Sequence, residues 1–103
     1  MNYIEIKTTF EEKGEAEKLA ELLLDKRLIA CGQVFEIASH YIWKNERFIE
    51  KEFMLMMKTK ESLFGQVEKE IKENHPFEVA EIIALPIQNI SKEYANWIDE
   101  NTI

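Results

Sequence analysis

Apolar and polar residues alternate at the start of this chain and then recur at helical spacing. Residues 3–8 alternate, which predicts a strand with one buried face. Thr9 and Glu12 have the spacing of a helix-capping box. We therefore predict a helix that begins just after Thr9 and ends near Arg27. The apolar face of this helix consists of Ala16, Leu19, Ala20 and Leu23.

The longest alternating stretch lies in the middle of the chain and predicts a β-hairpin. Residues 30–43 and 47–59 alternate over lengths well beyond those of an ordinary strand. Residues 44–46, with the sequence Lys-Asn-Glu, supply a turn because asparagine tolerates positive φ. A hairpin of this length overhangs a chain of 103 residues. One face of its first strand carries Phe35, Ile37, Ser39, Tyr41 and Trp43.

The last part of the chain predicts a second helix, a strand and a terminal helix. Helical spacing runs from Thr59 to Asn74, and Pro76 ends it because proline disfavours helical geometry in the residue before it. Residues 81–87 form a mostly apolar run that predicts a strand. Ser91 is a suitable N-cap for a last helix. That helix is expected to bury Tyr94, Trp97 and Ile98.

The order of these elements predicts an α+β, ferredoxin-like βαββαβ fold, with a long hairpin between its second and third strands and a C-terminal helix. Residues 1–103 are expected to form a single domain, since this length suits one hydrophobic core. Both main helices should cover one face of an antiparallel sheet. The aromatic side chains on the open face and on the hairpin would then contact water unless a partner covers them. We therefore predict a subunit interface at Phe35, Tyr41, Trp43 and Phe48.

The charge of the chain narrows the range of partners. It has 20 Asp and Glu residues against 13 Lys and Arg residues, with a formal net charge of -7. This charge disfavours binding to nucleic-acid phosphates and to anionic membranes, so we expect neither partner. Cys31 is the only cysteine, which excludes an intrachain disulfide. No basic-then-apolar leader follows Met1, so a cytoplasmic protein is expected.

Five spaced segments of the chain carry a family resemblance. They are residues 28–31, 41–43, 53–59, 75–87 and 94–98. Together they resemble the CutA family of divalent-cation tolerance proteins, and the similarity extends from Thr8 to Trp97. The resemblance implies a ferredoxin-like homotrimer built much like the PII signalling proteins, with the long hairpins contributing to contacts between subunits. It also implies a role in tolerance of copper and other divalent cations, Cu(II) binding by some members, and no firmly attached catalytic activity.

The resemblance also implies where a metal would bind. Copper ligands proposed in some members include a cysteine at the end of the first strand, where this chain has Thr8. A histidine pair before the proline is reduced here to Asn74 and His75, and a glutamate at the start of the last core strand is kept as Glu81. The resemblance thus implies a site for a divalent cation such as Cu(II) at His75 and Glu81, with no cofactor that the protein requires.

The position of His75 allows a second interpretation. A neutral imidazole is a common metal donor, but a cationic side chain at the end of a helix also interacts well with the helix dipole. One histidine and one glutamate are few donors for a transition metal, which usually takes three or four from protein. A neighbouring subunit would have to supply the others.

Several classes of function are compatible with the predicted fold. The leading hypothesis is a trimeric binding or regulatory module, not an enzyme, with ligand sites in clefts between subunits. A sensor of a small molecule in the same clefts, with no physiological metal, is the alternative. An enzyme is less favoured because the sequence has no glycine-rich phosphate loop and no HExxH-like set. The acidic charge, and the lack of the basic-glycine-aromatic string of RRM domains, argue against RNA binding.

Overall fold

A computed structural model describes residues 2–103 as a four-stranded sheet with three α-helices. Within this part of the chain, none of the helices has both the length and the apolar character needed to cross a bilayer. In chain order the elements are β1 (Tyr3–Phe10), α1 (Lys13–Asp25), β2 (Cys31–Trp43), β3 (Glu46–Lys60), a short 3-10 helix (Glu61–Leu63), α2 (Phe64–Asn74), β4 (Ile83–Pro86) and α3 (Lys92–Asn101).

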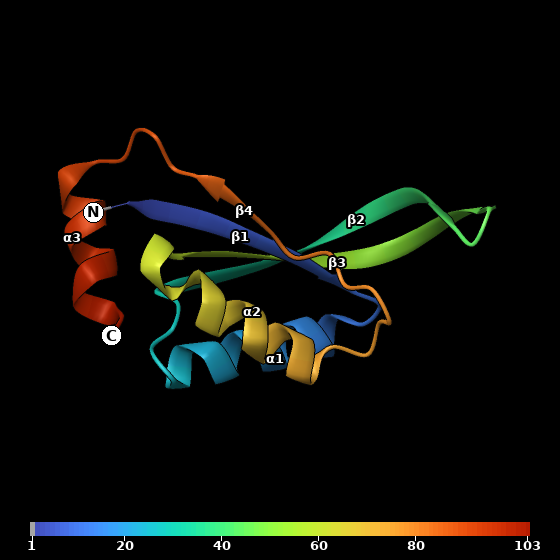
Figure 1. Ribbon diagram of the computed structural model, residues 1–103, viewed down its shortest axis with the longest axis horizontal. Coiled ribbons are helices and arrows are strands. Elements are labelled where there is room, and N and C mark those ends of the chain that lie inside the picture. Colours follow the sequence, from blue (N-terminus) through green and yellow to red (C-terminus); the bar gives the residue numbers. More distant parts are fainter. Residues whose placement is uncertain (1) are drawn as a thin grey trace.

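The strands lie in the order β2-β3-β1-β4, and all neighbouring strands are antiparallel. Helices α1 and α2 lie on the same side of the sheet, and α3 stands at the end opposite the hairpin (Figure 1). This arrangement confirms the predicted α+β, ferredoxin-like fold. It leaves β2 and β4 as the two edge strands.

The hydrophobic core lies between the sheet and helices α1 and α2. Successive side chains of a strand point to opposite faces, so the even-numbered residues of β1 face the helices, and Ile6 and Thr8 are fully buried there. Leu55 and Met57 of β3 are fully buried on the same face. The predicted apolar face of α1 is confirmed, because its buried residues are Ala16, Leu19, Ala20 and Leu23. Each large side chain buried in this way contributes about 1.5–3 kcal/mol.

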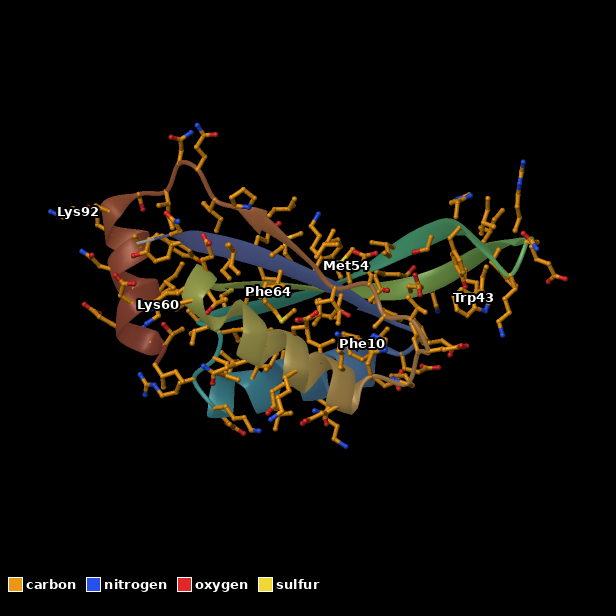
Figure 2. All side chains as sticks on the ribbon, viewed as in Figure 1. Phe10, Trp43, Met54, Lys60, Phe64 and Lys92 are labelled. Carbon is orange, nitrogen blue, oxygen red and sulfur yellow. The ribbon has the colours of Figure 1, made fainter. Side chains whose placement is uncertain are left out.

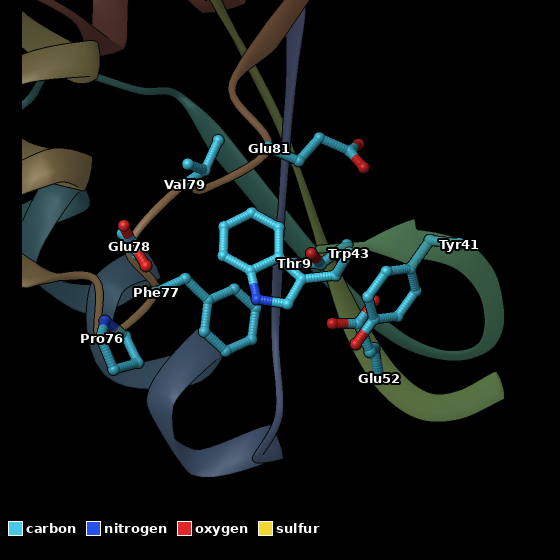
Figure 3. Close-up of a pocket in the computed structure, with 9 residues that line it drawn as sticks. All are labelled: Thr9, Tyr41, Trp43, Glu52, Pro76, Phe77, Glu78, Val79 and Glu81. Carbon is cyan, nitrogen blue, oxygen red and sulfur yellow. The ribbon is translucent and has the colours of Figure 1, made fainter. Parts of the chain in front are cut away.

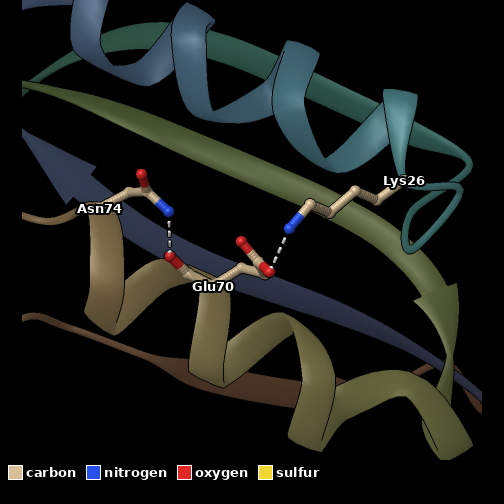
Figure 4. A network of polar contacts seen from close by, with 3 residues as sticks. All are labelled: Lys26, Glu70 and Asn74. Atoms are coloured by element: carbon tan, nitrogen blue, oxygen red, sulfur yellow. Dashed lines mark hydrogen bonds and ion pairs between the residues drawn. The ribbon is translucent and has the colours of Figure 1, made fainter.

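An ion pair joins α2 to Lys26, the residue that caps the end of α1. Lys26 Nζ lies 2.6 Å from Glu70 Oε1, and Asn74 Nδ2 donates a hydrogen bond to the backbone oxygen of Glu70 at 2.8 Å (Figure 4). Lys26 is about half exposed, so the ion pair contributes only about 0–1 kcal/mol. The hydrogen bond from Asn74 lies in the last turn of α2. Helix α2 ends at Asn74, immediately before the segment that carries the candidate site.

The predicted long hairpin is confirmed. β2 and β3 pair continuously from Cys31 opposite Lys58 to Trp43 opposite Glu46. The turn between them places Lys44 and Asn45 at positive φ, as the sequence predicted for Asn45. The hairpin projects beyond the helices and gives the molecule its longest dimension, 44 Å (Figure 1). Trp43 lies near its far end, where no helix covers the strands (Figure 2).

The first strand is longer than predicted, and the capping box at Thr9 and Glu12 is wrong. Thr9 pairs with Met54 of β3, so its backbone is extended. β1 continues to Phe10 because the long β3 supplies partners for it. Helix α1 begins at Lys13, and Glu12 occupies the N-cap position without a side-chain hydrogen bond. Pairing across the sheet therefore overrides the local capping signal.

Two later boundaries also differ from the prediction. Helix α2 begins at Phe64 and not at Thr59, because Thr59 is still paired with Ile4 of the central strand. The last strand is confined to Ile83–Pro86, the residues that pair with β1. Glu81 therefore precedes this strand and lies in the loop that leads into it.

The terminal helix begins as predicted but buries less than predicted. Ser91 Oγ accepts a hydrogen bond from the backbone N–H of Tyr94 at 3.1 Å, which confirms the N-cap. Ile98 is fully buried and Tyr94 is partly buried, but Trp97 is exposed in the single chain. The prediction that Trp97 is buried is therefore wrong for one protomer. The hydroxyl of Tyr3 donates to the carboxylate of Asp99 and ties α3 to the first strand.

Candidate functional site

A cavity of about 440 Å³ opens between the hairpin and the loop that joins α2 to β4 (Figure 3). Strand alternation places Thr9, Tyr41, Trp43 and Glu52 on the sheet face opposite the helices. The loop supplies the other wall of the cavity. The lining residues are Thr9, Tyr41, Trp43, Glu52, Pro76, Phe77, Glu78, Val79 and Glu81.

The end of the hairpin is held close to this loop. Lys44 Nζ lies 3.9 Å from Glu78 Oε2. The same ammonium group lies 5.5 Å from the centre of the Trp43 ring. Both side chains of this ion pair are exposed, so it adds little to stability. Trp43 of the hairpin and Phe77 of the loop line the same cavity.

Glu52 is the most covered of the three glutamates that line the cavity. Its side chain lies on β3 and only 9% of the residue is exposed, whereas Glu78 and Glu81 are exposed. Among residues 2–103, no hydrogen bond or ion pair is made by the Glu52 carboxylate. In Figure 3 this carboxylate lies close to the rings of the cavity, while that of Glu81 extends away from them. The cavity therefore combines apolar ring surface with a largely covered glutamate that has no hydrogen-bond or ion-pair partner among the described residues.

Tyr41 is held in place by its neighbours on the hairpin. Its hydroxyl donates to Glu50 Oε1 at 2.5 Å, and its ring stacks on Phe48 with centroids 5.5 Å apart. The hydrogen bond with Glu50 raises the pKa of Tyr41 to about 12, helped by desolvation and by the negative charges of Glu50 and Glu52. The phenol is therefore protonated at neutral pH and acts as a hydrogen-bond donor.

His75 lies just after α2, beside the cavity. Its Nε2 is 2.6 Å from the backbone oxygen of Thr9, and its Nδ1 accepts a hydrogen bond from the backbone N–H of Phe77 at 3.2 Å. This pairing requires a neutral ring with the proton on Nε2. The ring also stacks on Phe10, with centroids 4.2 Å apart.

The pKa of His75 agrees with this neutral form. Burial lowers it below the ordinary value of 6.5, and the opposing effects of the Thr9 carbonyl and of the charges on Glu15 and Glu52 are smaller. His75 does end α2 as its C-cap. It does so as a neutral, hydrogen-bonded ring, so the helix-dipole interpretation, which needs a cation, does not describe it at neutral pH.

The residues of one chain offer a metal only a partial donor set. Both ring nitrogens of His75 already have partners, and a metal would have to replace one of them. Within residues 2–103, no three His, Cys, Asp or Glu side chains are grouped so that they could hold an ion. Thr8, which stands where some family members have a cysteine, is fully buried on the helix side of the sheet. The metal site at His75 and Glu81 stays a prediction, and it needs donors from a second chain.

The four predicted interface residues share one face of the hairpin. Phe35 and Tyr41 are exposed, and Trp43 and Phe48 are partly buried. Two of them, Tyr41 and Trp43, also line the cavity. Their role between subunits stays a prediction, since a single chain shows only that their surfaces are available.

Sequence reasoning missed Glu52 and Phe77. Glu52 looked like any polar residue of an alternating strand, and the loop that lines the cavity with it lies 24 or more residues further along the chain. Phe77 belongs to the segment that resembled a known family, but its ring was not assigned a role. The signal that could have indicated Glu52 was strand alternation, which places it on the same face as the aromatic residues of the hairpin.

Comparison with known proteins gives a consistent result along the chain. The family model described as CutA1 divalent ion tolerance protein matches residues 4–101. A curated relative from Thermotoga maritima, "Divalent-cation tolerance protein CutA", is 38% identical over 96 residues, which cover 93% of this chain and 95% of the relative.

Solved structures agree with the sequence comparison. The crystal structure of CutA1 from Pyrococcus horikoshii superposes with a TM-score of 0.93 at 34% identity, covering 97% of this chain and 98% of that one. A structure from Archaeoglobus fulgidus, described as a periplasmic divalent cation tolerance protein CutA, has a TM-score of 0.94 at 35% identity and covers 96% of this chain and 97% of that one.

Proposed function

Because the chain belongs to the CutA1 family of divalent ion tolerance proteins, we propose that it works as a homotrimeric, PII-like binding module in the response to divalent metal ions. It binds its ligand and catalyses no reaction. The family is named for tolerance, and the cavity presents no nucleophile paired with a base.

The observation that carries the proposal is the apolar surface of the hairpin. Ile42 and Ile49 are each 72% exposed, and Phe35 is 44% exposed. Strand β4 adds an edge on which both Ile83 and Leu85 are exposed. Apolar surface gathered on a projecting hairpin and a free strand edge is typical of a subunit interface. The exposure of these apolar side chains is the reason to expect an oligomer, and the family resemblance is the reason to expect a trimer.

A divalent metal ion is proposed to bind only weakly. His75 and Glu81 are two donors, and His75 must give up a hydrogen bond before it can coordinate. A neighbouring subunit in the trimer would complete the set. Calorimetric titration with Cu(II) should therefore show micromolar or weaker binding that His75→Ala removes. Unchanged binding in this variant would take His75 out of the site.

The proposal places the protein in the cytoplasm. Its single cysteine, Cys31, is a free thiol, which fits a reducing compartment. Cell fractionation beside compartment markers tests this. Recovery with a periplasmic marker, the compartment named for the Archaeoglobus fulgidus structure, would refute it.

Light scattering after size-exclusion chromatography tests the assembly. The wild type should elute at three times the chain mass of 12.2 kDa. Phe35→Glu should dissociate it, since the charge would be buried without a partner. Leu24→Glu is the matched control, because Leu24 is similarly exposed, at 37%, but lies on helix α1 away from the hairpin. A wild type that elutes as a single chain at micromolar concentration would overturn the trimer.

A further inference from the structure

Glu52 places a carboxylate in the wall of the cavity. The residue is 9% exposed and lines the cavity, and its carboxylate has no hydrogen-bond or ion-pair partner among the described residues. Its oxygen atoms still reach solvent, since Thr8 Oγ1 is the only fully buried side-chain polar atom without a partner in the described part of the chain. A cation in the cavity would meet this carboxylate beside largely apolar walls, where the attraction between opposite charges is stronger than in open water, so the cavity suits positive charge.

Aromatic rings form much of the remaining wall. Tyr41, Trp43 and Phe77 all line the cavity, and Figure 3 shows the Glu52 carboxylate beside the ring of Tyr41. The negative faces of such rings attract ammonium groups, most strongly for tryptophan. The chain already uses this property at the rim, where the ammonium group of Lys44 lies 5.5 Å from the Trp43 ring centre.

The size of the cavity and its donors favour an organic cation over a metal ion. A volume of about 440 Å³ lies in the range of small-molecule sites and far exceeds that of a bare ion. A transition metal takes three or four protein donors, and within residues 2–103 no such group is present. An anion would be repelled by Glu52 and by the exposed Glu78 and Glu81 at the rim.

We propose that this cavity binds an organic cation, an ammonium group that carries alkyl substituents. Glu52 neutralises its charge, and the rings of Trp43, Phe77 and Tyr41 contact its alkyl groups. This inference rests on the proposed function as a binding module and names the class of its ligand.

Choline and its uncharged isostere 3,3-dimethylbutan-1-ol test the proposal. The two molecules have the same shape, and they differ by a carbon atom in place of the ammonium nitrogen. Calorimetry and the indole N–H resonance of Trp43 would report binding to the assembled protein. We expect choline to bind at least about tenfold tighter than the isostere, which corresponds to about 1.4 kcal/mol, since the ring faces and the Glu52 carboxylate attract the charge that the isostere lacks. Equal affinities, or no saturable binding at millimolar choline, would overturn the proposal.

Charge variants locate the site. Glu52→Gln keeps the shape of the side chain and should weaken choline binding by at least about tenfold, with little effect on the isostere. Glu36→Gln is the matched control, because Glu36 is on the opposite face of the same hairpin, next to the position that pairs with Glu52. It should leave the affinity within about twofold. Lys44→Gln removes a competing positive charge and should strengthen binding. Equal losses in Glu52→Gln and Glu36→Gln would mean that only the overall charge matters, and would refute the site.

The same samples separate this inference from the proposed assembly. A trimer that does not bind choline would overturn the organic-cation site and leave the trimeric module standing. A single chain that binds choline through Glu52 would overturn the trimer and leave the site standing.

Discussion

The two fully buried threonines of the sheet should respond to the same substitution with opposite signs. Thr8 on β1 and Thr59 on β3 are both 0% exposed on the helix-facing side. Thr59 Oγ1 donates a hydrogen bond to the backbone oxygen of Leu28 at 2.7 Å. Thr8 Oγ1 has no partner among the described residues. Substitution by valine replaces each hydroxyl with a methyl group of similar size.

The expected change in the free energy of unfolding depends on whether each hydroxyl has a hydrogen-bond partner. Thr59→Val leaves the Leu28 carbonyl without its donor, and a buried polar group that loses its partner costs about 1–3 kcal/mol. Thr8→Val removes a hydroxyl that already bears this cost, so it should stabilise the protein by about 1 kcal/mol. The free energies of unfolding of the two variants should therefore differ by at least about 2 kcal/mol.

Urea denaturation followed by circular dichroism measures these differences. All samples need the same protomer concentration, because assembly makes apparent stability depend on concentration. The m-value should stay constant, so that a shift in midpoint reports stability alone. Thr59→Ser is the control, since it keeps the hydroxyl and should retain the bond to Leu28. If Thr8→Val were destabilised as much as Thr59→Val, the Thr8 hydroxyl would have to be bonded, and the reasoning would fail.

Three further predictions concern backbone packing, pH and helix capping. A Cβ at Gly32 would lie 3.2 Å from the Cβ of Ala20, so Gly32→Ala should destabilise the protein by about 1–3 kcal/mol. A Cβ at Gly65 on α2 meets nothing within 4 Å, so Gly65→Ala should stabilise the protein by about 0.5–1 kcal/mol, and thermal denaturation compares the two variants. The folded-state pKa of His75 is lowered, so the unfolded chain binds more protons, and the free energy of unfolding should fall as the pH drops below 6.5 towards the folded pKa. Urea titrations at several pH values should show that His75→Gln removes this contribution to the pH dependence. Ser91→Ala should cost about 0.5–2 kcal/mol and speed amide exchange in the first turn of α3, and unchanged exchange would contradict its capping role.

The fold could be predicted where local pattern and pairing agree. The hairpin follows from strict alternation on both sides of an asparagine turn, and the structure confirms its register from Cys31 to Trp43. Prediction failed where pairing decides the outcome against a local signal. Thr9 and Thr59 both have the residue type that starts helices, yet both remain in strands because the partner strand continues beside them.

The site was harder to predict than the fold because it is assembled across the chain. His75 could be singled out by residue type, but its two hydrogen bonds depend on Thr9 and Phe77, and these give it a neutral, positioned ring. Glu52 lines the cavity together with residues of the loop after α2, which is distant from it in sequence. A strand pattern indicates which face a residue is on, but it does not show what lies over that face.

Neighbouring residues of β1 point to opposite faces of the sheet, so a residue at position 8 and a residue at position 9 lie in different surroundings. Thr8, which replaces the cysteine donor of some members, points to the helices, while its neighbour Thr9 lines the cavity on the other face. A change at residue 8 therefore alters a buried position in the core and leaves the cavity wall intact. In this chain, threonine at position 8 is therefore compatible with an intact cavity wall at Thr9. The acidic cavity needs only Glu52 and the rings, none of which lies on β1.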